Sequence, residues 1–489
     1  MDKAVRVRLE LGELAGVRDG ELVRFRAVPY AAPPVGPLRF APPQPPARWQ
    51  GVRDATRPGP IPPQPPSRLR AAMGDYTREQ SEDCLTLDIV TPAPDGARRP
   101  VVVWLHGGAF LSGAGSLDWY DGAALAAAGD LVFVGVNYRL GPLGFLCLPG
   151  CADGLMGLRD QTAALRFVAA HIGAFGGDPE NVTLMGQSAG GISILRLLAM
   201  EETAGLFRRA IVQSAPPRLG PSEEEAAGRA RRLMALLGID PAAPDAADRL
   251  RAAPAAELIT LQMQIARENA TFASIDPAFP PVSDGSASVA EFTRRAAEAA
   301  VRRGVDLLVG STREEMHAFF VADPAMETPD PAKMADLFTG LAGSAGAMAF
   351  YAQRRPGASA RDVLGDLVTE HRFDRPVADL ADQMARAGRP VFVYRFDWAP
   401  PGSKWKACHC IELPFVLGTW RHWEPPMIAG GDPAQMEALS GTMMRMWASF
   451  ARGGDPSLVD LPWPRYAAPD RPVMRFGELI EPAFTRLAC

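Results

Sequence analysis

Ser188 stands in the run GQSAG at residues 186–190, which has the spacing of a nucleophilic serine on a tight turn. Strand-like residues 182–185 precede this run, and helix-forming residues 191–200 follow it. Such a turn raises the serine hydroxyl above the backbone, and the two glycines let strand and helix approach closely. The helix also directs free N–H groups and the positive end of its dipole toward charge developing on a substrate oxygen. With 47 glycines in the chain the motif alone could arise by chance, but its flanking pattern favours a nucleophile.

Two adjacent glycines could supply the matching anion site. Gly107 and Gly108 follow directly after His106 and the apolar run 100–105. Glycines placed after a strand can turn their N–H groups outward, and with the N–H of Ala189 they would give three donors for a negatively charged oxygen. Losing one such donor typically costs about 3 kcal/mol of transition-state stabilisation. An ordinary Gly-Gly turn is the alternative, but the position upstream of the serine favours an oxyanion hole.

A carboxylate and a histidine are expected later in the chain, because this kind of turn orders its triad serine, acid, histidine. Glu314 and Glu315 follow the apolar run 305–309, and either could be the acid, although alone they would suggest the solvated start of a helix. Of six histidines, His409 alone lies in a loop-like segment after the last clear strand, residues 390–396. It would take the serine proton while the carboxylate fixes its tautomer and stabilises the imidazolium.

The cysteines beside His409 allow a different chemistry. Cys408 and Cys410 flank the histidine, and these residue types are also zinc ligands. Zinc ligands are usually spaced by two to four residues, and a second pair would have to come from Cys147 and Cys151. This ligand set argues against a metal site.

The residues that carry this chemistry follow short, continuous apolar runs that alternate with helix-like segments. Strands buried on both faces and alternating with helices predict an α/β fold, in which helices cover a large, mostly parallel sheet. The predicted strands are residues 100–105, 131–136, 182–185, 210–213, 305–309 and 390–396.

Other stretches do not follow this alternation of strands and helices. Residues 5–31 alternate apolar and polar side chains around a turn, which predicts an antiparallel hairpin. Residues 29–66 contain too many prolines for a helix or a central strand, so we expect extended chain on the surface. Residues 221–300 and 323–385 are mainly amphipathic helices, which we interpret as insertions that roof the sheet. We take residues 1–489 as a single catalytic domain.

Composition narrows the class of partner. The net charge is −5 without a long run of one sign, which gives no sign of a nucleic-acid or anionic-membrane partner. Only four of the 51 basic residues are lysines, a compositional bias that we do not interpret as an arginine-based binding surface. The N-terminus lacks the apolar stretch of a secretory signal, no window reaches the roughly 18 apolar residues of a membrane helix, and the six cysteines are sparse. We therefore expect a cytoplasmic monomer that acts on a small molecule.

Nearly from end to end, the chain resembles the type-B carboxylesterases, which include bacterial para-nitrobenzyl esterases and animal cholinesterases. Blocks that carry the resemblance include SEDCLTLDIVTP, VVVWLHGGAF, FGGDPENVTLMGQSAGG, GSTREEMHAFF and ACHCIELPF. The resemblance implies the α/β-hydrolase fold and ester hydrolysis through an acyl-enzyme, without a cofactor. It places the nucleophile at Ser188, the acid at Glu315 and the base at His409. It also matches the oxyanion donors Gly107, Gly108 and Ala189, and a serine near the triad, Ser214.

Several positions depart from the family pattern. Gln187 precedes the nucleophile where the family commonly has Glu, which removes a buried charge and could change the pH response of the site. Cys84 lies where secreted relatives form a disulfide, but Pro62 stands at the position of its partner, so that bridge cannot form. Side chains replace three glycines that are usual near the histidine and the acid, and we expect them to narrow the pocket: Lys406, Cys410 and Met316.

Two other functions compete with ester hydrolysis: hydrolysis of carbamates or amides, and binding without catalysis. Gln187 together with the HCIE segment resembles a bacterial subset of the family described as aryl carbamate hydrolases. Carbamates and amides differ from esters in the leaving group, so the same triad could cleave them. Some animal relatives are adhesion proteins without catalysis, but those typically lack part of the triad, whereas every member is present here. The sequence therefore favours an enzyme over a binding module.

Overall fold

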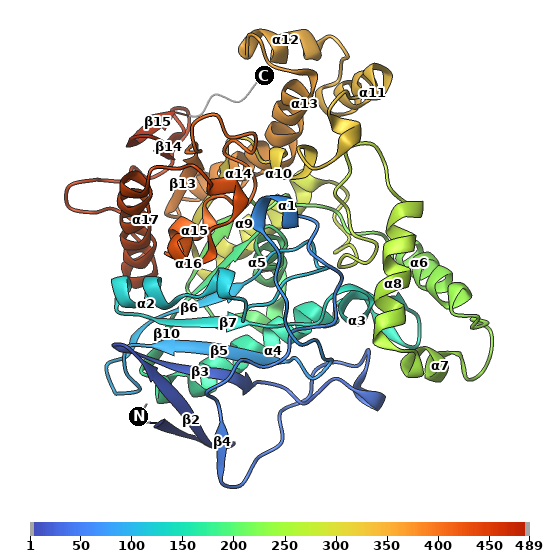
Figure 1. The fold of residues 1–489 in the computed structure, drawn as a ribbon, viewed down its shortest axis with the longest axis vertical. Coiled ribbons are helices and arrows are strands. Elements are labelled where there is room, and N and C mark those ends of the chain that lie inside the picture. Colours follow the sequence, from blue (N-terminus) through green and yellow to red (C-terminus); the bar gives the residue numbers. More distant parts are fainter. Residues whose placement is uncertain (1–3, 485–489) are drawn as a thin grey trace.

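The structure, a computed structural model that describes residues 4–484, contains one mixed sheet of thirteen strands within that range (Figure 1). Its centre is parallel, as the apolar runs predict, and six of its seven parallel strands overlap the six predicted runs. The predicted α/β fold is thus confirmed. Across the sheet the parallel strands are, in order, β7 (Val132–Val136), β6 (Arg99–Leu105), β10 (Gly177–Gln187), β11 (Arg209–Gln213), β12 (Asp306–Thr312), β13 (Val391–Phe396) and β14 (Pro472–Phe476).

Antiparallel strands extend the sheet at both ends. The predicted N-terminal hairpin is a three-stranded meander, because a second reversal at residues 10–11 divides its first half into two strands. The meander consists of β1 (Ala4–Leu9), β2 (Gly12–Asp19) and β3 (Leu22–Pro29). Next to β3 in the sheet lies β5 (Thr86–Thr91), and the short strand β4 (Val52–Asp54) pairs with β2. At the other end of the sheet, β15 (Ile480–Phe484) pairs with β14.

The proline-rich stretch, residues 29–66, is mostly extended, with only a short 3-10 turn and β4 as regular structure. Its last part differs from the surface position that we expected, because residues 61–65 are buried. The Gln64 side chain donates a hydrogen bond to the Gly113 carbonyl at 2.9 Å and accepts one from the Gly113 N–H at 2.6 Å. This segment therefore supports the loop that follows β6.

Helices cover both faces of the sheet, which explains why its central strands are apolar throughout. In β6, Val101 and Val103 belong to one hydrophobic cluster, whereas Val102 and Trp104 belong to another. The first cluster is completed by α4 (Met156–His171), α5 (Ala189–Ala199), α9 (Val289–Arg303) and α14 (Arg375–Arg386). The second is completed by α2 (Ala123–Gly129), α15 (Leu413–Val416) and α17 (Pro433–Gly453).

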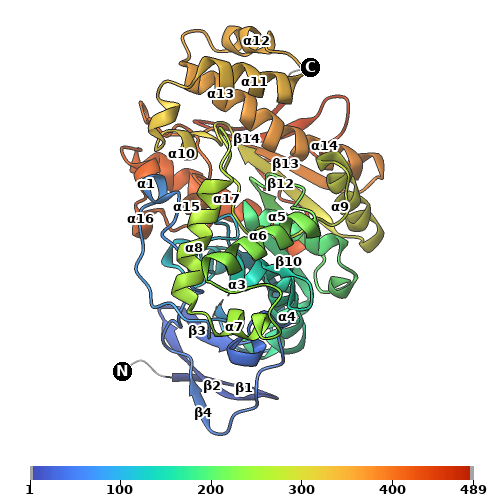
Figure 2. The same ribbon diagram turned by 90° about the vertical axis from the view of Figure 1, so that its right-hand side faces the viewer.

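Two groups of helices lie outside these layers, and Figures 1 and 2 show them apart from each other. The first comprises α6 (Glu223–Leu236), α7 (Ala246–Ala252) and α8 (Ala255–Glu268). The second comprises α11 (Pro331–Ala342), α12 (Ala347–Arg354) and α13 (Ala360–Thr369). Both groups belong to the stretches predicted as insertions, but α9 and α14 from the same stretches pack on each other and form part of the layer on the sheet.

Short elements complete the chain: α1 (Arg70–Met73), α3 (Gly141–Phe145), α10 (His317–Phe320), α16 (Trp420–Trp423) and a two-stranded ribbon of β8 (Cys147–Leu148) and β9 (Ala152–Asp153). No helix within residues 4–484 combines the length and the apolar character that crossing a bilayer requires. The five cysteines in the same range are free thiols, Cys84 among them, while Cys489 lies outside the described residues.

Candidate active site

Ser188 occupies the turn between β10 and α5, as its motif predicts. Its backbone has φ 56° and ψ −119°, a sparsely populated conformation that typically costs about 1 to 3 kcal/mol. The turn is possible because α5 crosses very close to β6. A Cβ atom on Gly190 would lie 1.9 Å from the carbonyl oxygen of Leu105, so only glycine fits there. The Ser188 N–H donates to the Gln213 carbonyl at 2.9 Å, which fixes the turn against β11.

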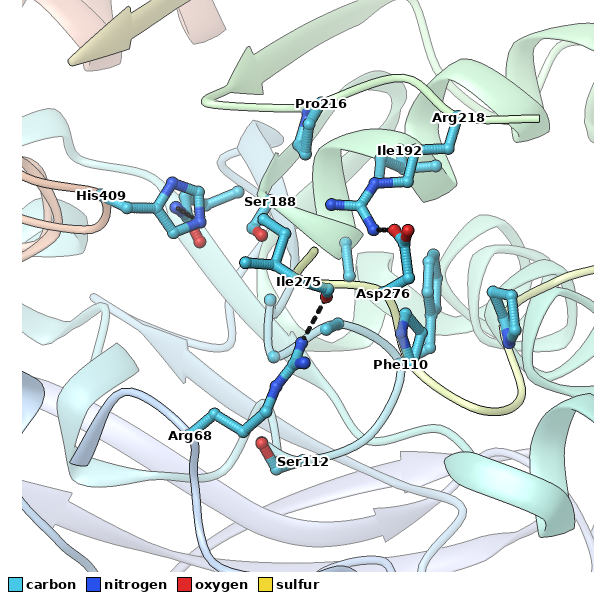
Figure 3. Close-up of a pocket in the computed structure, with 18 of the residues that line it drawn as sticks. Arg68, Phe110, Ser112, Ser188, Ile192, Pro216, Arg218, Ile275, Asp276 and His409 are labelled. Atoms are coloured by element: carbon cyan, nitrogen blue, oxygen red, sulfur yellow. Dashed lines mark hydrogen bonds and ion pairs between the residues drawn. The ribbon is translucent and has the colours of Figure 1, made fainter. Parts of the chain in front are cut away.

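His409 lies against one of the two candidate carboxylates. Its Nδ1 is 2.5 Å from Oε2 of Glu315, and its backbone N–H donates to the Glu315 carbonyl at 3.3 Å. The other carboxylate oxygen, Oε1, accepts a hydrogen bond from the Thr312 N–H at 2.8 Å. Both side chains are almost completely buried, so the pair is shielded from solvent. Figure 3 shows the imidazole beside Ser188 at one side of a cavity.

Glu314 points elsewhere. Its carboxylate accepts hydrogen bonds from the Arg355 guanidinium at 2.9 Å and from the Ala407 N–H at 3.2 Å. Adjacent residues in this turn thus send their carboxylates to different partners, and the structure brings Glu315, rather than Glu314, to the imidazole of His409.

Gln187 contacts the same imidazole from the other side. Its Nε2 lies 3.1 Å from Nε2 of His409. Since Nδ1 of His409 faces a carboxylate and carries the proton, Nε2 accepts this hydrogen bond from the amide. Within the described residues, Ser188 makes no hydrogen bond to His409. The Gln187 amide therefore occupies the lone pair on His409 Nε2 that would accept the serine proton.

Three backbone N–H groups beside Ser188 have no acceptor. Those of Gly107, Gly108 and Ala189 donate to no residue within 4–484, and all three residues line the cavity. Gly108 has φ 108°, and a Cβ on it would lie 2.0 Å from the Ser112 carbonyl oxygen. The region is therefore closely packed and still leaves unpaired donors next to the serine, as an oxyanion hole requires.

His106 holds the first of these glycines. Its Nδ1 is 2.7 Å from the Gly107 carbonyl oxygen, and its ring stacks on Tyr138 with centroids 4.3 Å apart. Complete burial lowers the pKa of His106 to about 4, so the ring is neutral at pH 7 and Nδ1–H donates to the carbonyl. No feature of the sequence indicates this structural role of His106.

The cavity above Ser188 has a volume of about 590 Å³. Its aromatic wall includes Phe110, Trp119, Tyr120 and Phe319. Segments from both groups of outer helices contribute to it, with Arg229 from α6 and Leu341 from α11 among them. The site is therefore a deep, partly apolar pocket with the serine at its wall.

The three side chains expected to narrow the pocket behave differently from one another. Cys410 lines the cavity. Lys406 does not line it, because its Nζ binds the Asp362 carboxylate at 2.7 Å. Met316 is fully buried in a separate hydrophobic cluster with residues of α11 and α13. Only Cys410 fits the expectation.

Two buried acids behind the pair were not identified from the sequence. Burial, with the nearby charge of Glu315, raises the pKa of Glu412 to about 8. Burial likewise raises the pKa of Asp374 to about 7, although a hydrogen bond from Ser311 opposes the shift. Ser214 lies beside Glu412, where its hydroxyl favours the charged form. No motif or spacing in the sequence marks Glu412, because its burial next to Glu315 arises from the tertiary structure.

The cysteines beside His409 do not belong to a cluster of potential metal ligands in the described part of the chain. Within the described residues, no group of three or more His, Cys, Asp or Glu side chains is placed to hold an ion. Cys408 and Cys410 are buried, and burial raises the pKa of both thiols well above the ordinary value, which disfavours the thiolate.

Comparisons with known proteins identify the family of the chain. A family model described as the carboxylesterase family matches residues 3–483. A phenmedipham hydrolase of Pseudarthrobacter oxydans is 38% identical over 476 residues, 96% of this chain and 94% of that protein. A para-nitrobenzyl esterase of Bacillus subtilis (strain 168) is 37% identical over 480 residues, covering 94% and 92%. A probable N-octanoylanthranilate hydrolase of Rhodococcus erythropolis is 38% identical over 476 residues, covering 94% of both.

Solved structures agree along the whole chain. A thermophilic PNB esterase matches with a TM-score of 0.86 at 35% identity, over 99% of this chain and 98% of that one. A carboxylesterase of Geobacillus stearothermophilus matches with a TM-score of 0.85 at 35% identity, over 98% and 97%. The chain therefore belongs to the carboxylesterase family, has the α/β-hydrolase fold, and is a carboxylic ester hydrolase.

Proposed function

We propose that the chain hydrolyses small-molecule carboxylic esters through an acyl-enzyme on Ser188, with His409 as the base and Glu315 as the supporting acid. The observation that carries the proposal is the buried contact of 2.5 Å between His409 Nδ1 and Glu315, beside a strained serine in a cavity with three unpaired N–H groups. These are the components that nucleophilic acyl transfer needs.

The steps follow from these positions. Ser188 Oγ attacks the ester carbonyl as its proton passes to Nε2 of His409, which has to exchange its hydrogen bond with Gln187 for one with the serine. The carbonyl oxygen becomes negative and accepts hydrogen bonds from the free N–H groups of the oxyanion hole. Collapse of the tetrahedral species breaks the ester C–O bond, and the alcohol leaves with the proton from His409. Water then attacks the acyl carbon and gives its proton to Nε2 of His409. The C–O bond to Ser188 breaks, the proton passes to Ser188 Oγ, and the acid is released.

The test is Ser188→Ala with para-nitrophenyl butyrate as the substrate. We expect kcat to fall by a factor on the order of 10⁵ or more, because the covalent route is lost. The fold should be retained, which thermal unfolding followed by circular dichroism checks. A fluorophosphonate probe should label the unaltered protein and not the variant. A variant that keeps near-normal turnover would refute the proposal.

A carbamate or amide hydrolase is the second candidate. Gln187, whose side chain contacts His409, favours it, since this glutamine together with the HCIE segment resembles the pattern of aryl carbamate hydrolases. The relative named phenmedipham hydrolase adds phenmedipham itself as a substrate to try. Comparing kcat/KM for a matched ester, carbamate and anilide separates the two candidates: an ester preference supports the first, and equal or faster carbamate cleavage supports the second.

A further inference from the structure

Three arginines from distant parts of the sequence converge on the cavity that holds Ser188. Arg68 precedes α1, Arg218 follows β11, and Arg372 lies in a π-helical segment, η6 (Glu370–Asp374), directly before α14. They cannot be grouped from the sequence, because arginine is frequent along the whole chain and hides any local enrichment.

Two of these arginines hold one loop of the cavity wall. Arg68 donates a hydrogen bond to the Ile275 carbonyl at 2.8 Å, and Arg218 forms an ion pair with the Asp276 carboxylate. Figure 3 shows both guanidinium groups pointing into the cavity and bound to this loop. Arg372 forms no hydrogen bond or ion pair with any residue in the described part of the chain.

The charges on the cavity wall do not balance. Asp276 is already paired with Arg218, and Glu225 caps α6 by accepting the Ser222 N–H at 2.8 Å. Neither Arg68 nor Arg372 therefore has a carboxylate partner. The wall carries five arginines, Arg68, Arg196, Arg218, Arg229 and Arg372, against two carboxylates, Asp276 and Glu225.

The surrounding protein makes this excess of positive charge costly. Arg68 is exposed to solvent where it lines the cavity, so a ligand can reach it, and the surrounding protein atoms lower the pKa of its guanidinium to about 10. Burial, together with the charges of Arg372 and Arg68, lowers the pKa of Arg218 to about 9, and the ion pair with Asp276 acts in the opposite direction. All remain cations at pH 7. An anion in the cavity would relieve both the desolvation and the mutual repulsion.

We propose that the cavity binds esters that also carry a carboxylate, and that Arg68 and Arg372 hold this carboxylate while the ester carbonyl lies at Ser188. The inference rests on the proposed function of Ser188 and adds a substrate class to it. A guanidinium presents a planar fork of donors that matches a carboxylate, and the aromatic wall accommodates the rest of the molecule. The ester carbonyl and the carboxylate are separate groups of one substrate.

The test uses a pair of esters that differ in charge and by one methyl group: mono-para-nitrophenyl glutarate and its methyl ester. The variants are Arg68→Gln and Arg372→Gln, and the matched control is Arg70→Gln, which removes one exposed arginine outside the cavity, two residues from Arg68. We expect either cavity variant to lower kcat/KM for the carboxylate ester by about 10- to 100-fold more than for the neutral ester, the loss typical of a charge-assisted hydrogen bond. Arg70→Gln should leave the ratio of the two rates unchanged.

A second pair, 4-carboxyphenyl butyrate and its methyl ester, puts the carboxylate on the leaving group and shows which side of the ester faces the arginines. Comparing each variant with the unaltered protein cancels differences in intrinsic reactivity. Equal losses for charged and neutral esters in both pairs, or no losses, would overturn the inference. The proposed function is tested separately. If the arginine variants give one of these results but Ser188→Ala abolishes turnover of the neutral ester, the role of Ser188 is retained and only the inference about the carboxylate is wrong.

A variant that does not fold is recognised by thermal unfolding, and the unaltered protein then provides the test. Each kcat/KM is divided by the rate constant for hydroxide-catalysed hydrolysis of the same ester, which corrects for intrinsic reactivity. The corrected value should favour the carboxylate ester at least tenfold in one of the two pairs. A corrected preference for the neutral ester in both pairs would contradict the inference.

Discussion

Two neighbouring glutamates differ only in where their carboxylates point, and this difference predicts unequal effects on catalysis. Glu315→Gln removes the charge that faces His409 Nδ1 at 2.5 Å, so we expect kcat for para-nitrophenyl butyrate to fall on the order of 10³-fold or more. Glu314→Gln removes the partner of Arg355 and should lower the free energy of unfolding by about 1 to 3 kcal/mol with much less effect on kcat. A larger loss of kcat in Glu314→Gln would assign the acid to the other residue.

The contact between Gln187 and His409 predicts that adding a negative charge at position 187 changes the pH dependence of kcat/KM. A carboxylate in its place would face Nε2 of His409 and favour the protonated imidazole, which cannot act as a base. In Gln187→Glu we therefore expect the acid limb of the kcat/KM profile to move to higher pH by about one unit, measured with para-nitrophenyl butyrate between pH 5 and 9. The control is Gln187→Met, which removes the hydrogen bond without adding charge. If the acid limbs of the kcat/KM profiles of Gln187→Glu and Gln187→Met coincide, a negative charge at position 187 does not affect the protonation of His409.

The sequence predicted part of the site and missed the rest for identifiable reasons. Ser188 and His409 are recognisable because local motifs mark them. Residue spacing alone leaves the acid open between Glu314 and Glu315, since the geometry of the turn is unknown, and the family resemblance selects Glu315. Glu412 and Arg372 carry no local signal. Their environments come from tertiary contacts, burial near Glu315 in one case and convergence with distant arginines in the other, and neither contact can be derived from spacing along the chain.

At the level of elements, the approach of α5 to β6 is what raises the serine. Gly190→Ala would place a Cβ 1.9 Å from the Leu105 carbonyl oxygen, so the helix has to move away from the strand. We expect the free energy of unfolding in urea to fall by about 1 to 3 kcal/mol, with a parallel loss of kcat. Gly228→Ala in α6 is the control, because its Cβ would meet only the tip of Arg231 at 4.0 Å and alanine favours a helix. Equal stabilities of the two variants would contradict this account.

The predicted bounds were most accurate for strands that are buried on both faces and therefore continuous in apolar residues, as in β6 and β7. For β10 only the buried residues 182–185 of the longer strand were predicted. It was least complete at the edges. The second reversal at residues 10–11 lacks a glycine or proline before Gly12, so the meander appeared as one hairpin. The helices α9 and α14 have the amphipathic pattern of the outer helices, and only their packing on each other and over the sheet separates them from those groups.

For the whole molecule, the buried acids predict how stability depends on pH. The pKa of Glu412 is about 8 in the folded chain, above its ordinary value near 4.3, because burial disfavours the charged form. Between these values the folded state holds a proton that the unfolded state has released. The contribution of Glu412 to the free energy of unfolding therefore falls as pH rises from about 4 to 8, and is constant outside that window.

Glu412→Gln removes this titration, so the stability of the variant relative to the unaltered protein should increase as pH is raised from 5 to 8. The measurement is urea unfolding at half-unit steps of pH, and only the change in the difference is diagnostic, since the substitution also alters contacts with Gln213. Asp374→Asn is the matched comparison: with a pKa of about 7 for Asp374, its relative stability should stop increasing about one pH unit earlier. A difference that does not change with pH would mean that Glu412 is charged in the folded protein, and that the buried negative charge of Glu315 does not reach it.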